Sequence, residues 1–152
     1  MGVIRNKMAA DDIQKHIREY GWHCLHVFDP EGEKQDFSYS IGFEATYDHP
    51  EVIVFGLGRE TAHEILSDIA SDLKNGIKYK TNTRLKNIIS GNFEVMFKEV
   101  KGDAFHTYLG TAADFYGKPF RAYVLFWPDK GNRLPMDAGC EVTVQDEALE
   151  IV

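Results

Sequence analysis

The sequence predicts an α+β fold, with a mostly antiparallel sheet or a partly closed barrel and two to three flanking helices. Residues 37–43 alternate apolar with small side chains, which is the period of a strand buried on one face. Residues 52–57 are apolar on both faces, as in a central strand. Residues 62–73 repeat apolar side chains at helical spacing. Strict strand–helix alternation is absent, which disfavours a doubly wound parallel sheet.

The first third of the chain predicts a helix and then a hairpin. Residues 10–20 form the helix, because Ile13, Ile17 and Tyr20 share one face and a glycine follows. Strands are expected over 22–28 and 37–43, with turn chemistry at Asp29-Pro30-Glu31-Gly32 between them. In the second strand the serines are expected to face away from the core.

The clearest helix follows the central strand and ends at Asn75-Gly76. Its apolar face is expected to pack on the inward face of the sheet. The residues predicted to make this contact are Ile65, Leu66, Ile69 and Leu73 from the helix and Val54, Phe97 and Val124 from the sheet.

The remaining elements follow from shorter patterns. Residues 93–100 read as a one-sided strand, with Phe93, Val95 and Phe97 inward and Glu94, Met96 and Lys98 outward. A helix is expected over 103–116, although Gly110 weakens it. A strand over 120–127 ends at the turn 128–131, and a last short strand is expected over 140–144.

Composition limits the class of protein and its partners. The 152 residues are expected to form one domain, residues 1–152, with 43% hydrophobic and 27% charged residues, a globular balance. The net charge of −7 argues against binding to nucleic acid and to anionic membranes. No apolar run is long enough to span a bilayer, and the N-terminus lacks an apolar signal core. With only two cysteines, a cytoplasmic location with reduced thiols is expected.

A polar connection between two strands is the first candidate site. Asp48 and His49 lie in it, and loops beside a rigid strand often carry function. With Glu44 and either His23 or His26 they could form a Zn²⁺ site or an acid–base pair. The alternative is structural: Asp48 caps a turn and His49 bonds to the backbone.

Trp127 and Asp129 at the end of a later strand are the second candidate site. We expect His49 to reach the C-terminal end of strand 120–127, so that both sites form one composite site. No Gly-x-Ser-x-Gly elbow, His-Glu-x-x-His motif or phosphate-binding glycine loop is present.

Four blocks in order resemble an uncharacterised, mainly bacterial family, the domain of unknown function four-two-six-two. The blocks are Gly21-Trp22, residues 37–42, His49-Pro50-Glu51 through Gly56-Leu57, and Trp127-Pro128-Asp129 through Pro135. The similarity runs over about residues 11–149, nearly the whole chain. Met136 stands where the family pattern has tryptophan, and Asp146 where it has proline.

The resemblance implies no activity, but it implies that its shared polar positions form one region. These are Tyr39, Ser40, His49, Glu51, Trp127 and Asp129. Together the two lines of argument give a set of candidate ligand-binding residues: Tyr39, Ser40, Asp48, His49, Trp127 and Asp129.

Three functions stay open from the sequence. The first is a non-catalytic module that binds a small ligand or a protein partner, including a basic one, as a monomer or homodimer. The second is a metal-assisted or acid–base hydrolase that uses His49 and Asp48. The third is a flavin-binding barrel, suggested only by short strands and the many aromatic residues. No cofactor is specified by the sequence.

Overall fold

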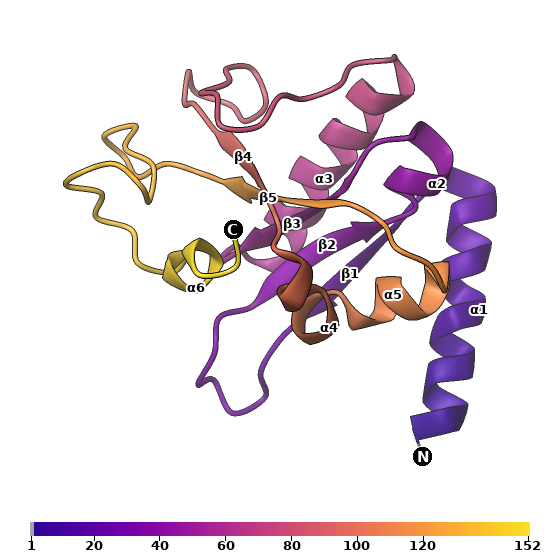
Figure 1. Cartoon of the computed structure of the whole chain (residues 1–152). Coiled ribbons are helices and arrows are strands. Elements are labelled where there is room, and N and C mark those ends of the chain that lie inside the picture. Colours follow the sequence, from indigo (N-terminus) through magenta and orange to yellow (C-terminus); the bar gives the residue numbers. More distant parts are fainter. Residues whose placement is uncertain (1) are drawn as a thin grey trace.

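A single five-stranded sheet forms the centre of the fold in the computed structural model, which describes the backbone of residues 2–152 and the side chains of residues 10–152 (Figure 1). The strand order is β1-β2-β3-β5-β4. Every neighbouring pair is antiparallel except β3 and β5, which are parallel. The strand bounds are β1 His23–Val27, β2 Phe37–Ile41, β3 Glu51–Phe55, β4 Met96–Glu99 and β5 Ala122–Phe126. The predicted α+β fold with a mostly antiparallel sheet is confirmed. The barrel alternative is wrong, because the sheet is open, with β1 and β4 at its edges.

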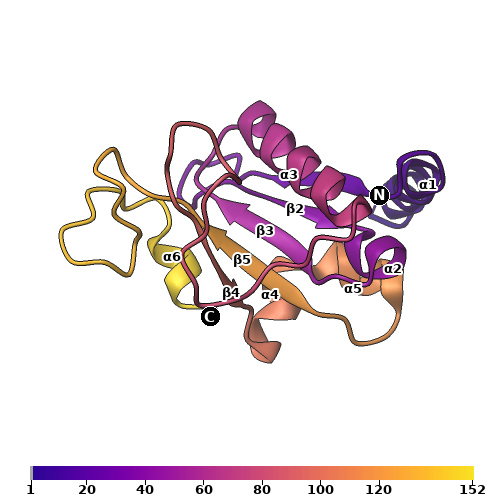
Figure 2. The same cartoon turned by 90° about the horizontal axis from the view of Figure 1, so that it is seen from above.

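Helices cover both faces of this sheet. The long helix α3 lies on one face, and α4 and α5 lie on the other (Figure 2). The helix α1 lies beside the sheet near β1 (Figure 1). The helix bounds are α1 Gly2–Tyr20, α2 Phe43–Tyr47, α3 Arg59–Lys74, α4 Phe105–Tyr108, α5 Gly110–Tyr116 and α6 Asp146–Leu149, with a 3-10 turn at Gly102–Ala104.

The α3 face of the sheet contains the packing that the helical pattern predicts. Leu66, Ile69 and Leu73 are buried in one cluster with Val54 and Phe97. Ile65 is only partly buried at the margin of this cluster. Val124 was wrongly expected here, because it points to the opposite face; its neighbour Leu125 takes the place, as the alternation of a strand requires.

The opposite face holds a second core, so β2 is buried on both sides. Tyr39 and Ile41 pack there with residues of β3, β5, α1 and α5. Ser38 and Ser40, expected to face away from the core, are completely buried on the α3 side. The small side chains of these serines therefore allow α3 and its neighbours to cover β2 closely, and they do not indicate a solvent-exposed face.

Four further expectations differ from the structure. Phe43 begins α2 instead of ending a strand, so the polar connection is partly helical. The helix expected over 103–116 breaks at Leu109, immediately before Gly110. Met96 packs against the α5-side core instead of facing outward. Residues 140–144 form no strand; Val144 instead packs against Gly56, where a Cβ atom would clash at 2.5 Å, and the unpredicted α6 follows.

The long connection between α3 and β4 covers one edge of the sheet. Leu85 and Val95 exchange two backbone hydrogen bonds of 2.9 Å, and the Asn82 amide donates to the carbonyl of Phe97 at 2.8 Å. These contacts occupy part of the outer side of β4. No helix among the described residues has the length and apolarity to cross a bilayer.

Truncating Leu66 tests the packing of α3. Leu66→Ala is expected to lower the free energy of unfolding by about 2–5 kcal/mol, because it leaves a cavity in a fully buried site. The measurement is the urea midpoint. Ile77→Ala, at a side chain 46% exposed, is the control and should change it little. Equal effects of the two substitutions would contradict this packing.

Candidate functional site

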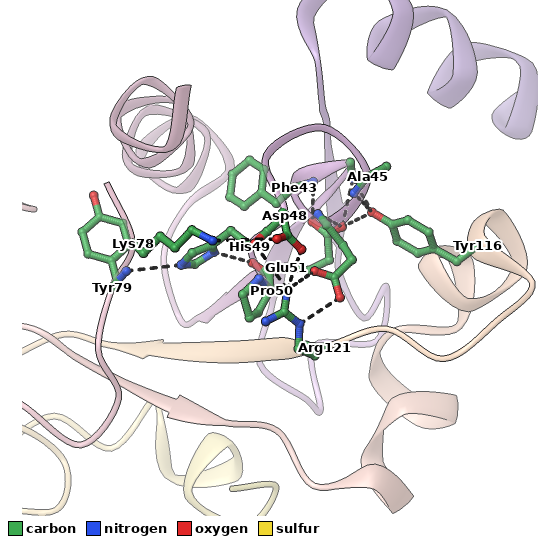
Figure 3. Close-up of polar contacts among 12 residues, drawn as sticks. Phe43, Ala45, Asp48, His49, Pro50, Glu51, Lys78, Tyr79, Tyr116 and Arg121 are labelled. Atoms are coloured by element: carbon green, nitrogen blue, oxygen red, sulfur yellow. Dashed lines mark hydrogen bonds and ion pairs between the residues drawn. The ribbon is translucent and has the colours of Figure 1, made fainter. Parts of the chain in front are cut away.

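The carboxylate of Glu51 is buried at the point where β2, β3, α2 and α5 meet. Glu51 is fully buried, at the first position of β3. Ser40 donates its hydroxyl to Oε1 at 2.7 Å. The Tyr116 hydroxyl donates to Oε2 (Figure 3). Three backbone amides at the start of α2 also donate to it, those of Gly42 (3.0 Å), Phe43 (3.0 Å) and Glu44 (3.2 Å). Glu51, at the start of β3, thus caps the N-terminus of α2, whose N-cap residue Gly42 offers no side chain for this purpose.

Burial and hydrogen bonding act on Glu51 in opposite directions. Burial raises the pKa of Glu51 to about 7, while the donors around it favour the charged form. Burial and the nearby Glu51 charge raise the pKa of the Tyr116 hydroxyl, which therefore keeps its proton and acts as a donor. Gly42 has φ of 121°, and a Cβ atom there would lie 2.8 Å from the Gly21 carbonyl, so only glycine fits beside this carboxylate.

His49 is also buried and internally bonded. Its Nδ1–H donates to the Pro50 carbonyl at 2.8 Å, and its Nε2 faces the Tyr79 amide at 3.5 Å (Figure 3). Its ring packs edge-on against Tyr79 and Tyr123. Burial lowers the pKa of His49, so the ring stays neutral. Both ring nitrogens are engaged, which leaves none directed at a substrate.

Asp48 faces solvent and does not join His49 in an acid–base pair. Its side chain is 86% exposed, and it ends α2 in the left-handed conformation that aspartate tolerates. It lies 3.4 Å from Arg121, which also forms a two-point ion pair with Glu44 at 2.9 and 2.5 Å. Such exposed pairs contribute little to stability. This geometry matches the structural alternative for both residues, a turn cap and a backbone hydrogen bond.

Half-buried Trp127 and buried Asp129 occupy a separate junction after β5. The Trp127 indole N–H donates to the Phe55 carbonyl at 2.8 Å. Buried Gln145 bonds both backbone groups of Trp127, at 3.0 and 2.7 Å. Asp129 accepts four hydrogen bonds of 2.9–3.0 Å, from the amides of Gly131, Arg133 and Glu141 and from Arg133 Nε. These bonds, above all that from the Glu141 amide, lower the pKa of Asp129 to about 2.

The two candidate sites lie at opposite ends of the sheet. Glu51 is paired in register with Ala122 on parallel β5, so His49 lies beside the beginning of β5. Asp129 follows the end of that strand, about 13 Å further along for five residues. The expected composite site is therefore wrong. Nothing in the local patterns of either segment shows that β3 and β5 run parallel.

The remaining sequence candidates do not form a metal centre. Tyr39 is buried and bonds to Thr111 and the backbone of Ala112 on α5. His26 bonds Ser38 at 2.6 Å, on β1, two strands away from His49. Within the described part of the chain, no three His, Cys, Asp or Glu side chains are arranged to hold a metal ion.

A groove beside the edge strand β1 was missed by the sequence reasoning. It has a volume of about 460 Å³ and continues into a second hollow of about 360 Å³. Both are lined by Cys24, Arg59 and His63. Trp22 also lines the groove, and its ring contacts those of Phe43 and His63. Four of the six histidines line these hollows: His16, His23, His26 and His63. The concentration of histidines in the first 63 residues was the sequence signal for this groove. The sequence alone does not show that α1, β1 and α3 lie next to one another.

Arg59 supplies a permanent positive charge to the groove, and Glu60 lines the adjoining hollow. Exposed Arg59 forms no ion pair with any side chain that the structure describes. His16 and His23 share a hydrogen bond of 2.7 Å between their Nδ1 atoms. Burial, and next the His16 charge, lower the pKa of His23 to about 4, so it is neutral at pH 7. Burial raises the pKa of Cys24 to about 11, which makes its thiol a poor nucleophile.

The fold and these contacts define a class: an open-sheet α+β protein whose buried polar side chains serve as internal hydrogen-bond partners. Residues 16–141 match the family described as Domain of unknown function (DUF4262), and the chain belongs to that family. We found no significant match to a curated protein or to a solved structure.

Replacing Glu51 tests its capping role. Glu51→Gln is expected to cost about 2 kcal/mol or more at pH 8, because whichever oxygen becomes the amide nitrogen, at least two donors lose an acceptor at about 1–3 kcal/mol each. Tyr116→Phe is the comparison; it removes a donor, leaves the carboxylate with its other partners, and should cost less. The measurement is urea unfolding, and an unchanged midpoint for Glu51→Gln would contradict the capping role.

Asp129 should affect acid stability. Its folded pKa of about 2 lies below its ordinary value of 3.8, so its stabilisation is present above 3.8 and is lost as the pH falls towards 2. The urea midpoints of the wild type and Asp129→Asn should therefore converge on acidification from about pH 5. Asp114→Asn, at an exposed residue, is the control, and its urea midpoint should differ little from that of the wild type at each pH. A gap that stays constant for Asp129→Asn would contradict this assignment.

Proposed function

We propose that this protein is a non-catalytic binding domain that holds a small anionic, ring-containing ligand in the groove beside β1. The observation that carries the proposal is Arg59, a cation without an ion-pair partner among the described side chains, in the same groove as Trp22. A guanidinium binds carboxylate or phosphate, and an indole face packs against a flat ring.

The satisfied state of the other polar groups supports binding rather than catalysis. Every buried side-chain nitrogen and oxygen in the described part of the chain has a hydrogen-bond partner. His49, Glu51 and Asp129 are used in this way. The hydrolase hypothesis required His49 and Asp48 to act together, and their geometry gives it no support.

Groove dimensions and donors support a small ligand. A volume of about 460 Å³ lies within the usual range for small-molecule sites. Imidazoles of His16, His23 and His63 and the hydroxyl of Ser67 supply further hydrogen-bonding groups around the floor. The free thiols of Cys24 and Cys140 fit a reducing cytoplasmic location, which is part of this proposal.

Nuclear magnetic resonance of the two tryptophans tests the groove. The chain has two indole N–H groups, so Trp127→Phe assigns both signals. The probes are benzoate, phenyl phosphate and the neutral analogue benzamide. The anions are expected to shift the Trp22 signal saturably with millimolar dissociation constants, the range for ligands of this size, and benzamide should bind more weakly.

Arg59→Gln is the decisive variant for this proposal. It should weaken the two anions about tenfold, the value of one charge-assisted contact, and leave benzamide unchanged. Lys74→Gln, with the same charge change at the other end of α3, is the matched control and should bind like the wild type. Absence of a Trp22 shift, or equal binding by wild type and Arg59→Gln, would overturn the proposal.

A further inference from the structure

A further hollow, distinct from the two beside β1, lies on the α3 face. It has a volume of about 360 Å³ and lies between α3 and the segment 85–95. Figure 2 shows that segment and α3 on the same side of the sheet. Its apolar lining comes from three parts of the chain: Leu57 and Ile65, the segment residues Ile88, Ile89 and Phe93, and Trp127.

The walls of this hollow are held in place before any partner arrives. Trp127 is fixed by its indole bond to Phe55 and by both bonds to Gln145. The segment 85–95 is closed by the backbone pair of Leu85 and Val95. Arg84, next to it, bonds Glu94 at 3.1 Å and Asp137 at 2.7 Å. A preformed apolar site with a rigid tryptophan has little conformational entropy to lose on binding.

Two carboxylates line the same hollow and supply its charge. Glu64 and Asp68 are exposed on successive turns of α3, and neither forms an ion pair with a described side chain. Like charges four residues apart on a helix repel. A cation placed between them would remove that repulsion, and a guanidinium could at the same time stack on the indole of Trp127.

We propose that this hollow docks a basic segment of a partner protein, in which an arginine or lysine adjoins an apolar side chain. The apolar side chain enters between α3 and residues 88–93, and the cation lies at the rim by Glu64 and Asp68. Tryptophan anchors surrounded by complementary charge are typical of binding hot spots. The net charge of −7 further favours a basic partner over an acidic one.

Synthetic peptides test this surface separately from the groove. The probe is acetyl-Ser-Leu-Arg-Leu-Arg-Ser-amide, followed through the indole N–H signals of the full chain. It should shift the Trp127 signal saturably and leave the Trp22 signal in place. One comparison peptide has glutamate at both arginine positions and the other has serine at both leucine positions; both should bind more weakly.

Paired substitutions distinguish docking in the hollow from general attraction to an acidic protein. Glu64→Gln with Asp68→Asn should weaken the probe roughly five- to tenfold, the sum of two exposed charge contacts. Asp103→Asn with Asp114→Asn removes the same charge from the opposite layer and should leave the affinity within about twofold. Ile89→Ser should also weaken binding, with the unchanged spectrum elsewhere showing that the variant is folded.

The outcomes divide clearly. A Trp127 shift that depends on Glu64, Asp68 and the leucines of the peptide supports the proposal. No shift at millimolar peptide, equal loss in both paired variants, or equal binding of the serine peptide overturns it. Binding in the groove is measured through Trp22 and docking in this hollow through Trp127. A negative result for one proposal therefore leaves the other proposal untouched.

Discussion

The buried carboxylate of Glu51 is the interaction on which the arrangement of the β3 end of the sheet depends. It joins β2 through Ser40, the amides that begin α2, and α5 through Tyr116. A five-residue helix has little stability of its own, so α2 depends on the acceptor that Glu51, at the start of the next strand, supplies to its N-terminal amides. At the other end of α2, Asp48 adopts the left-handed conformation and His49 bonds to the Pro50 carbonyl, so local backbone contacts hold both residues.

The family resemblance therefore rests largely on residues that hold junctions together. Gly42 lets β2 turn into α2, Gly56 admits Val144, and Asp129 closes the turn after β5. Trp22 and Trp127 differ, because each belongs to such a junction and also faces a hollow. Glu51, His49 and Asp129 bond to the backbone, whereas Trp22 and Trp127 each line a hollow.

Regular elements could be predicted from sequence where one periodicity dominated, and connections between elements could not. The α3 stripe and the apolar run of β3 were read correctly because burial fixes their patterns. Ser38 and Ser40 misled because close helix packing and solvent exposure both favour small side chains. The separation of His49 from Asp129 depends on the parallel pairing of β3 with β5, which local spacing does not encode. The groove beside β1 could not be predicted, because that requires the positions of α1 and α3 relative to β1. Its histidines were therefore interpreted separately.

The two edges of the sheet are not equivalent, and this limits how copies of the chain could associate. An uncovered edge strand can accept a strand from another molecule. The outer side of β4 is partly occupied by the connection through Asn82 and Leu85, whereas β1 has no strand on its outer side in the described part of the chain. Two copies joined edge to edge through β1 would leave a β4 strand at each end of the combined sheet. Because the connection through Asn82 and Leu85 covers part of each β4 edge, such a pair would offer less free backbone for further strand addition than a β1 edge does.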